Sequence, residues 1–229
     1  MQTITRERKS SGRGQTGDLA TPAKPEVGMI LDEDLLDAII DDRQATGTDL
    51  RDEVWDGVYM IMPQANDTHQ EIVQGLCFAF ETVSGRGVGG KVRPGVNVSD
   101  RDDDWTKNYR DPDVVVFLSG TTAINRDTYW LGGPDFAVEV VSKGDRSRDK
   151  LDFYAKVNVR ELLLVDRFPW SLELYRNLGG VMELVGRSSV EGQVDLPSEV
   201  LPLTFRLIPG TDRPQIRVTE RNGDRAWSV

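Results

Sequence analysis

The sequence predicts a mixed α/β domain built on one central sheet, and three observations carry that prediction. Two apolar runs rich in β-branched residues, at 109–117 and 133–142, are each bounded by Pro or Gly, as buried strands are. Apolar residues recur at helical spacing before and after these runs. The predicted order is helix, hairpin, helix, several strands, helix, strand and hairpin, which is typical of one sheet flanked by helices.

The first quarter of the chain is predicted to hold an arm, a helix and a hairpin. Residues 1–25 are rich in Gly, Ser, Thr, Pro and basic residues and have few bulky apolar ones, which predicts a disordered basic arm. Apolar residues at helical spacing predict an amphipathic helix over 32–43. Residues 53–62 form two alternating runs that meet at Asp56-Gly57, a strong hairpin signal.

The middle of the chain alternates between helical and extended patterns. Asn66 or Asp67 can cap a helix that continues to about Val83. Weak strands follow, and residues 99–108 are polar and acid-rich, which predicts an exposed loop. A further helix is predicted over residues 145–156.

The last third reads as strands that complete the sheet. Residues 161–165 form an apolar run, residues 171–185 form a hairpin, and residues 201–208 add a last strand. The Pro/Arg-rich end is expected to be a frayed tail. We therefore expect an arm over 1–25, a folded domain over 26–208 and a tail over 209–229.

Composition narrows the class of protein. The formal net charge of -10 argues against broad, non-specific attraction to nucleic acid. Cys77 is the single cysteine, so an internal disulfide is excluded and a reducing, cytoplasmic location is expected. No stretch is long and apolar enough to span a membrane, and the N-terminus lacks the apolar region of a signal peptide.

Two carboxylates interrupt the two central apolar runs. Asp113 begins the first run and Glu139 lies inside the second, between two valines. A buried charge is costly unless it is paired or bound to a metal, so two such charges on neighbouring strands suggest a site. Lys150 lies beside the apolar stripe of the helix predicted next, which is expected to pack back across the sheet toward both acids.

Several segments in this order resemble one large bacterial family. They are Glu53-x-x-Asp-Gly57, Met62-Pro63 with His69-Gln70, Arg110-x-Pro-Asp-Val-Val-Val116, Pro134-Asp-x-x-Val-Glu-Val-x-Ser142, Asp149-Lys-Leu-x-x-Tyr-Ala155 and the run 161–166. Together they resemble the Uma-two family of restriction-endonuclease-like proteins over about residues 50–208. Each segment alone is a weak signal, and the series is specific.

The resemblance implies the PD-(D/E)xK nuclease fold, a restriction-endonuclease-like mixed sheet flanked by helices, with DNA as the substrate. It implies Asp113 and Glu139 as metal ligands and Lys150 as the lysine moved from the strand to the following helix. Hard oxygen ligands suit Mg²⁺ or Mn²⁺, which would polarise a phosphoryl oxygen and acidify a water. A homodimer is expected, because nucleases of this fold commonly pair.

Other residues have a functional and a structural interpretation. Glu53 is either an extra ligand or a strand-end acid, and His69, the only histidine, acts on phosphate or water or is simply exposed in its helix. Lys143, four residues after Glu139, is a rival to Lys150. Arg110, Arg146 and Arg148 contact DNA phosphates or are solvated surface charges.

Three functions remain open at this point. The first is a metal-dependent DNA endonuclease, and the second is an inactive nuclease-fold module that binds nucleic acid or a protein partner, because a fold alone does not establish activity. The third is a carboxylate-pair glycosidase, which would need a sugar cleft with aromatic platforms that the sequence does not reveal.

Overall fold

The computed structural model describes residues 33–144 and 146–229, so the predicted arm over 1–25 lies outside the described residues. The helices are α1 (Glu33–Thr46), α2 (Asp67–Ser84) and α3 (Leu151–Lys156), and the 3₁₀ helices are η1 (Arg86–Val88), η2 (Trp105–Lys107) and η3 (Ser147–Lys150). No helix in these two ranges has both the length and the apolar character needed to cross a bilayer.

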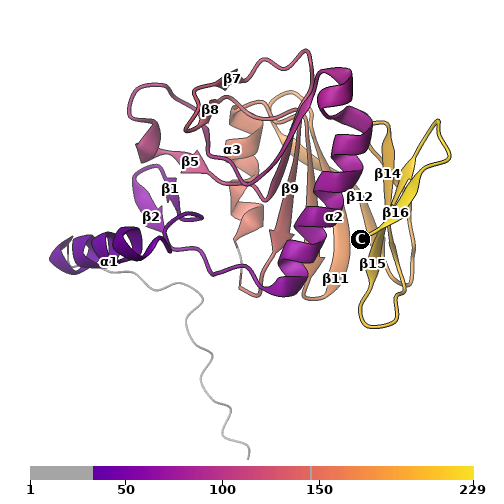
Figure 1. Cartoon of the computed structure of the whole chain (residues 1–229), viewed down its shortest axis with the longest axis horizontal. Coiled ribbons are helices and arrows are strands. Elements are labelled where there is room, and N and C mark those ends of the chain that lie inside the picture. Colours follow the sequence, from indigo (N-terminus) through magenta and orange to yellow (C-terminus); the bar gives the residue numbers. More distant parts are fainter. Residues whose placement is uncertain (1–32, 145) are drawn as a thin grey trace, which may run out of the picture.

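The strands form three sheets (Figure 1). The first sheet contains, in spatial order, β2 (Val58–Met60), β1 (Glu53–Trp55), β5 (Tyr109–Arg110), β4 (Val98–Ser99), β8 (Trp130–Leu131) and β7 (Ile124–Asn125). The central sheet contains β12 (Met182–Ser189), β11 (Trp170–Asn177), β10 (Glu161–Arg167), β9 (Phe136–Val141), β6 (Val114–Phe117) and β3 (Lys91–Pro94). The third contains β13 (Leu196–Pro197), β14 (Leu203–Ile208), β15 (Gln215–Glu220) and β16 (Ala226–Ser228).

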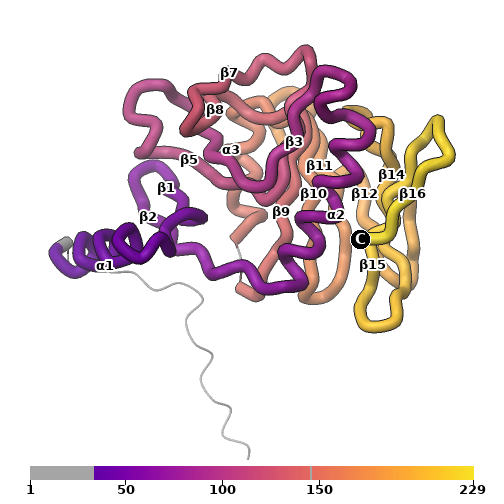
Figure 2. The backbone as a smooth tube through the Cα atoms, viewed as in Figure 1, coloured from indigo at the N-terminus to yellow at the C-terminus, as the bar shows by residue number. Residues whose placement is uncertain are grey.

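The central sheet is mixed, as the sequence predicts. Strand β9 pairs parallel with β10 and antiparallel with β6, and Figure 2 shows β9 and β10 side by side behind α2. The helix α2 and the third sheet cover one face through an apolar core that includes Ile72, Phe80 and Phe205. On the other face, α3 packs through a second cluster that includes Phe153 and Leu164. The central sheet therefore lies between α2 on one face and α3 on the other.

Local sequence signals set the two elements that lead into the site. Asp56 and Gly57 both have positive φ angles, 47° and 88°, which is the conformation that a tight hairpin turn requires and that Asp-Gly readily adopts. The side chain of Asn66 caps α2 by accepting a hydrogen bond from the backbone N–H of His69 at 3.0 Å. The hairpin and the cap were both predicted, and they fix where residues 51–69 approach the sheet.

Two segments differ from the sequence-based expectation. The end of the chain forms β15 and β16 rather than a frayed tail, because Ile216 and Val218 alternate into the apolar core and the third sheet seals one face of α2. Gly75 makes this contact close, since a Cβ there would lie 2.7 Å from Val229. The helix predicted over 145–156 is observed as η3 followed by the short α3, and Asp145 lies outside the described residues.

Candidate active site

The alternation of β9 brings Glu139 to the face opposite the main core. Val138 and Val140 belong to the core under α2, so Glu139 between them projects from the other face, toward α3. Strands β6 and β9 pair antiparallel with Val114 opposite Val138, and the next position in this register puts Asp113 opposite Glu139. Two acids far apart in the sequence are thus neighbours across two central strands.

Lys150 joins Glu139 to Glu53. Its ammonium group donates hydrogen bonds to Oε1 of Glu53 at 2.8 Å and to Oε1 of Glu139 at 3.0 Å, and all three side chains are buried. Tyr154, one helical turn after Lys150, donates its hydroxyl to the same oxygen of Glu139. The Trp55 indole N–H and the backbone N–H of Asp111 hold Glu53 at 2.6 and 2.9 Å. The lysine is therefore fixed rather than exposed.

Asp113 is held by a different set of groups. Its Oδ1 accepts from the Arg51 guanidinium at 2.8 Å and lies 2.9 Å from Nε2 of His69, while its Oδ2 accepts from the backbone N–H of Val140 at 2.8 Å. Arg51 also donates to Asp111 at 2.9 Å. His69 is buried on Asp113, so the expectation that it is solvent-exposed is wrong; its side of the first turn of α2 faces the sheet, while Asp67 and Gln70 of the same turn are exposed.

These side chains surround a cavity of about 50 Å³. Burial raises the pKa of Glu139 to about 8; Lys150 opposes this shift, and the negative charges of Asp113 and Glu53 add to it. Burial also raises the pKa of Asp111 to about 6, against the pull of Arg51, and raises the pKa of Asp113. Perturbed carboxyls crowded into a small cavity are typical of a functional site.

Among the lysines, Lys150 and not Lys143 lies at the carboxylates. Lys143 follows the end of β9, is exposed, and does not line the cavity. The resemblance implies a lysine that has moved from the strand to the following helix, and the position of Lys150 agrees with this. Glu53, which the sequence left between ligand and strand-end acid, is a direct partner of Lys150.

The predicted phosphate contact of Arg110 is not supported. Arg110 is buried, with its guanidinium 4.7 Å from the centre of the Trp55 ring and 4.2 Å from that of Phe153, and it donates to the backbone carbonyl of Val54. Its position is structural, because aromatic faces and backbone oxygens occupy it. Arg146 and Arg148 do reach the surface, where they pair with Asp149 and with Asp166 and Glu173.

Sequence reasoning missed three residues of this site. Arg51 precedes the first strand in a polar stretch that has no periodic pattern, and Asp111 is separated from Asp113 only by a proline. Tyr154 lies in the apolar stripe of the helix predicted over 145–156, although its four-residue spacing from Lys150 indicates that both share one helix face. The pairing of Asp111 with a distant arginine had no such signal.

The mixed sheet with two acids and a lysine at its centre defines a protein of restriction-endonuclease-like architecture. The model of the family Uma2, described as "Putative restriction endonuclease", matches residues 36–209, which is more than half of the chain. The chain therefore belongs to the Uma2 family.

One solved structure with a similar fold is a crystal structure of a putative nuclease belonging to DUF820 from Anabaena variabilis. It has 16% sequence identity and a TM-score of 0.50, and the alignment covers 64% of this chain and 81% of that one. At this identity the likeness concerns the fold, and it agrees with the mixed α/β class predicted from the sequence. A search of curated proteins finds no significant match.

Proposed function

We propose that the protein is a divalent-metal-dependent nuclease that hydrolyses DNA phosphodiester bonds at the cavity between Asp113, Glu139 and Lys150. One observation carries the proposal: two acids from opposed positions on adjacent strands and a buried lysine from the next helix converge on one cavity. Membership of a family of putative restriction endonucleases supports the same reaction class.

The donor chemistry of the cavity fits a small divalent cation. No group of three or more His, Cys, Asp or Glu side chains in the described ranges is arranged to enclose a metal ion. Magnesium, however, is commonly held by one or two carboxylates with water completing its shell. Within the described residues, the hydrogen bonds to Glu139 fall on Oε1, so Oε2 is the oxygen available to a cation. Burial raises the pKa of both carboxyls, so a cation that binds between them takes the place of a proton.

Asp113 and Glu139 would hold the ion, which when bound would polarise a phosphoryl oxygen and acidify a water. Lys150 presents a fixed positive charge beside Glu139, where it can stabilise charge that develops on the phosphate. Arg51 has a side chain that is 35% exposed, so its guanidinium can meet a phosphate at the cavity mouth while it remains near Asp113. His69 contacts the same oxygen of Asp113 as Arg51 does and helps to orient that carboxylate.

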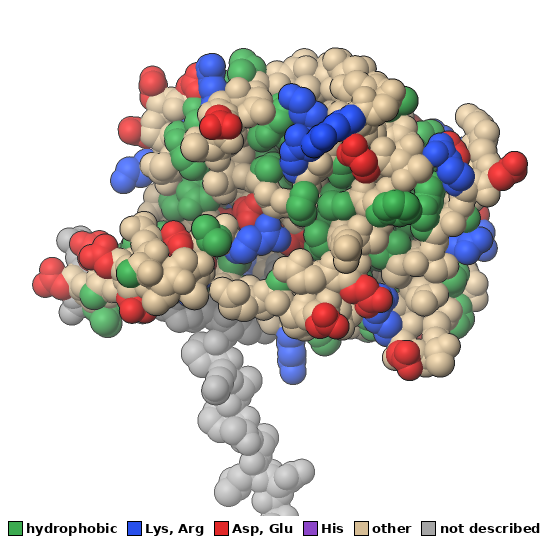
Figure 3. All heavy atoms as spheres, viewed as in Figure 1, with side chains coloured by type: hydrophobic (Ala, Val, Ile, Leu, Met, Phe, Trp, Pro, Cys, Tyr) green, Lys and Arg blue, Asp and Glu red, His purple; other side chains and the backbone are tan. Residues whose placement is uncertain are grey.

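The distribution of charged side chains favours binding of DNA through a local contact rather than through an extended basic surface. The view in Figure 3 shows acidic and basic side chains interspersed rather than one continuous basic face, which agrees with the net charge of -10. A cavity of about 50 Å³ suits a phosphate group and not a sugar ring, which disfavours the glycosidase alternative. The homodimer and the cytoplasmic location remain predictions.

The second candidate is an inactive module that retains this fold. It is favoured by the way Lys150 and Arg51 already neutralise the acids. Both candidates predict a stable site, so cleavage itself has to separate them.

The deciding experiment is cleavage of supercoiled and linear DNA at low salt with Mg²⁺ or Mn²⁺, for the wild type, Glu139→Gln and Glu183→Gln. Glu183 is an exposed acid on β12 and serves as the charge-matched control. We expect metal-dependent cleavage by the wild type and the control, and a loss of at least about 100-fold in Glu139→Gln. Absence of cleavage and of calorimetric metal binding in the wild type would support the inactive module instead.

A further inference from the structure

A second cavity adjoins the candidate active site. It has a volume of about 250 Å³ and shares two lining residues, Arg51 and Asp111, with the small cavity that contains Asp113 and Glu139. Because a water in the liquid takes about 30 Å³, this space equals about eight waters. That is room for one planar heterocycle.

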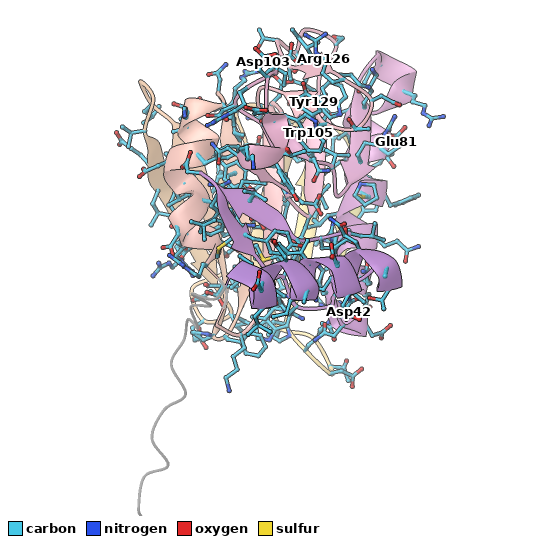
Figure 4. The ribbon with its side chains drawn as sticks, turned by 90° about the vertical axis from the view of Figure 1, so that its left-hand side faces the viewer. Asp42, Glu81, Asp103, Trp105, Arg126 and Tyr129 are labelled. Carbon is cyan, nitrogen blue, oxygen red and sulfur yellow. The ribbon has the colours of Figure 1, made fainter. Side chains whose placement is uncertain are left out.

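Two aromatic residues, Tyr129 and Trp130, line this cavity, and each stacks on a second ring behind it. Tyr129 stacks on Trp105 with ring centres 4.6 Å apart, and Trp130 stacks on Phe117 with centres 3.6 Å apart. Figure 4 shows Trp105 and Tyr129 together, close to Arg126 and Asp103. At the rim, Leu50 is 79% exposed and offers an apolar surface to an incoming ring.

The charge of the second cavity differs from that of a phosphate site. Its lining holds two acids, Asp111 and Asp127, and one cation, Arg51, which is already paired with Asp111 and Asp113. An anionic phosphate is therefore repelled, whereas a neutral group rich in N–H donors is attracted. Asp127 is exposed and Asn97 lies on the same lining, so a carboxylate and an amide are available to the edge of such a group.

We propose that this second cavity binds an unpaired nucleobase of the nucleotide next to the phosphate that enters the catalytic cavity. The proposal rests on the proposed nuclease function and names its substrate class as single-stranded DNA or DNA with an extruded nucleotide. Asp127 accepts a hydrogen bond from an exocyclic amine, so cytosine and adenine are preferred over thymine, whose carbonyl oxygens face the carboxylate unfavourably. Arg51 separates the base from the phosphate.

The test measures binding without cleavage. Fluorescence anisotropy in EDTA and at low salt compares labelled twelve-residue oligomers of deoxycytidine, deoxyadenosine and deoxythymidine. For the wild type we expect the first two to bind about fivefold more tightly than the third, at the low end of what one polar base contact provides. In Asp127→Asn this preference disappears. Because Asp127 has a φ of 74°, which Asn adopts readily, the variant keeps the backbone.

The matched control is Asp103→Asn. Asp103 is an exposed acid on a neighbouring loop and does not line the second cavity, so the variant changes the net charge equally and should retain the preference. Equal binding of all three oligomers by the wild type, a preference that survives in Asp127→Asn, or no binding at all would overturn the proposal. A protein that cleaves DNA but shows no preference refutes the base site alone, and one that shows the preference but never cleaves refutes the nuclease alone.

Discussion

The two faces of β9 carry opposite kinds of residue. On one face Phe136, Val138 and Val140 are buried among other apolar side chains. On the other, Glu139 is equally buried but is surrounded by charged and hydroxyl groups. Apolar burial stabilises the fold directly. A buried ionic cluster contributes little net stability, because the cost of removing its charges from water offsets their mutual attraction. The second face therefore reflects a requirement other than stability.

The largest expected effect tests the apolar face. Phe136→Ala removes a fully buried ring that contacts Phe80 and Phe205, with ring centres 5.5 and 5.7 Å away. We expect a loss of about 3–5 kcal/mol in the free energy of unfolding, measured by urea denaturation. Phe168→Ala, at a side chain that is 55% exposed, is the control and should cost much less. Similar losses in both variants would contradict this description of the core.

The charged face can be tested by removing its central cation. Lys150→Met leaves Glu53 and Glu139 buried without their shared partner, and we expect a loss of about 3–5 kcal/mol at pH 9. The loss should shrink at pH 6, because Glu139, whose pKa is raised to about 8, can then be neutral. Lys156→Met removes a surface ion pair with Asp100 and should cost less than about 1 kcal/mol at either pH. A pH-independent loss in Lys150→Met would argue against the pairing.

Gly95 tests how closely the charged face is packed. Gly95 has a φ of 52°, and a Cβ there would lie 1.7 Å from Nη1 of Arg51, so Gly95→Ala must displace the guanidinium, which bonds Asp111 through Nη1 and Asp113 through Nη2. The backbone cost is about 1–2 kcal/mol. Gly47→Ala, at φ 67° with nothing within 4 Å, carries the same backbone cost without the clash. We expect both variants to lose stability and only Gly95→Ala to lose metal-dependent cleavage; equal cleavage would remove Arg51 from the site.

The last test concerns a change in stability with each pH unit rather than a single loss. The folded pKa of Glu139 is raised above its ordinary value, so the folded state binds this proton more tightly than the unfolded state does. The metal-free wild type should therefore lose stability through this group as the pH rises from about 5 to 8. Glu139→Gln cannot ionise at this position. Its free energy of unfolding should therefore rise relative to that of the wild type by up to about 1.4 kcal/mol per pH unit in this range, measured by urea denaturation in EDTA. A constant difference across this range would show that the carboxyl is not perturbed.

The sequence revealed the two central acids of this site more readily than Arg51 and His69. Asp113 and Glu139 stand out because a charge in an apolar run has few explanations. Arg51 and His69 lie in polar stretches, and their direction depends on how the hairpin and α2 dock on the sheet. Local patterns record which residues are buried, and tertiary docking decides which of them meet.

The same limit applies to the fold. The hairpin at Asp56-Gly57 and the central strands follow from turn chemistry and β-branched runs, and both were predicted. Strand β15 alternates Ile216 and Val218, but nearby Pro and Arg residues masked the pattern, and only the third sheet makes it a strand. Short strands such as β7 and β8 have too few residues to show any periodicity.

The bond between Lys150 and Glu53 also has a consequence for the timing of synthesis. Its two residues are 97 positions apart in the chain. At a translation rate of about 5–20 residues per second, Lys150 follows Glu53 by roughly 5–20 seconds. During that interval the nascent chain acquires the hairpin, α2 and finally Glu139, but it still lacks the cation that completes their arrangement. The proposed cutting activity is therefore withheld from a half-made chain on the ribosome.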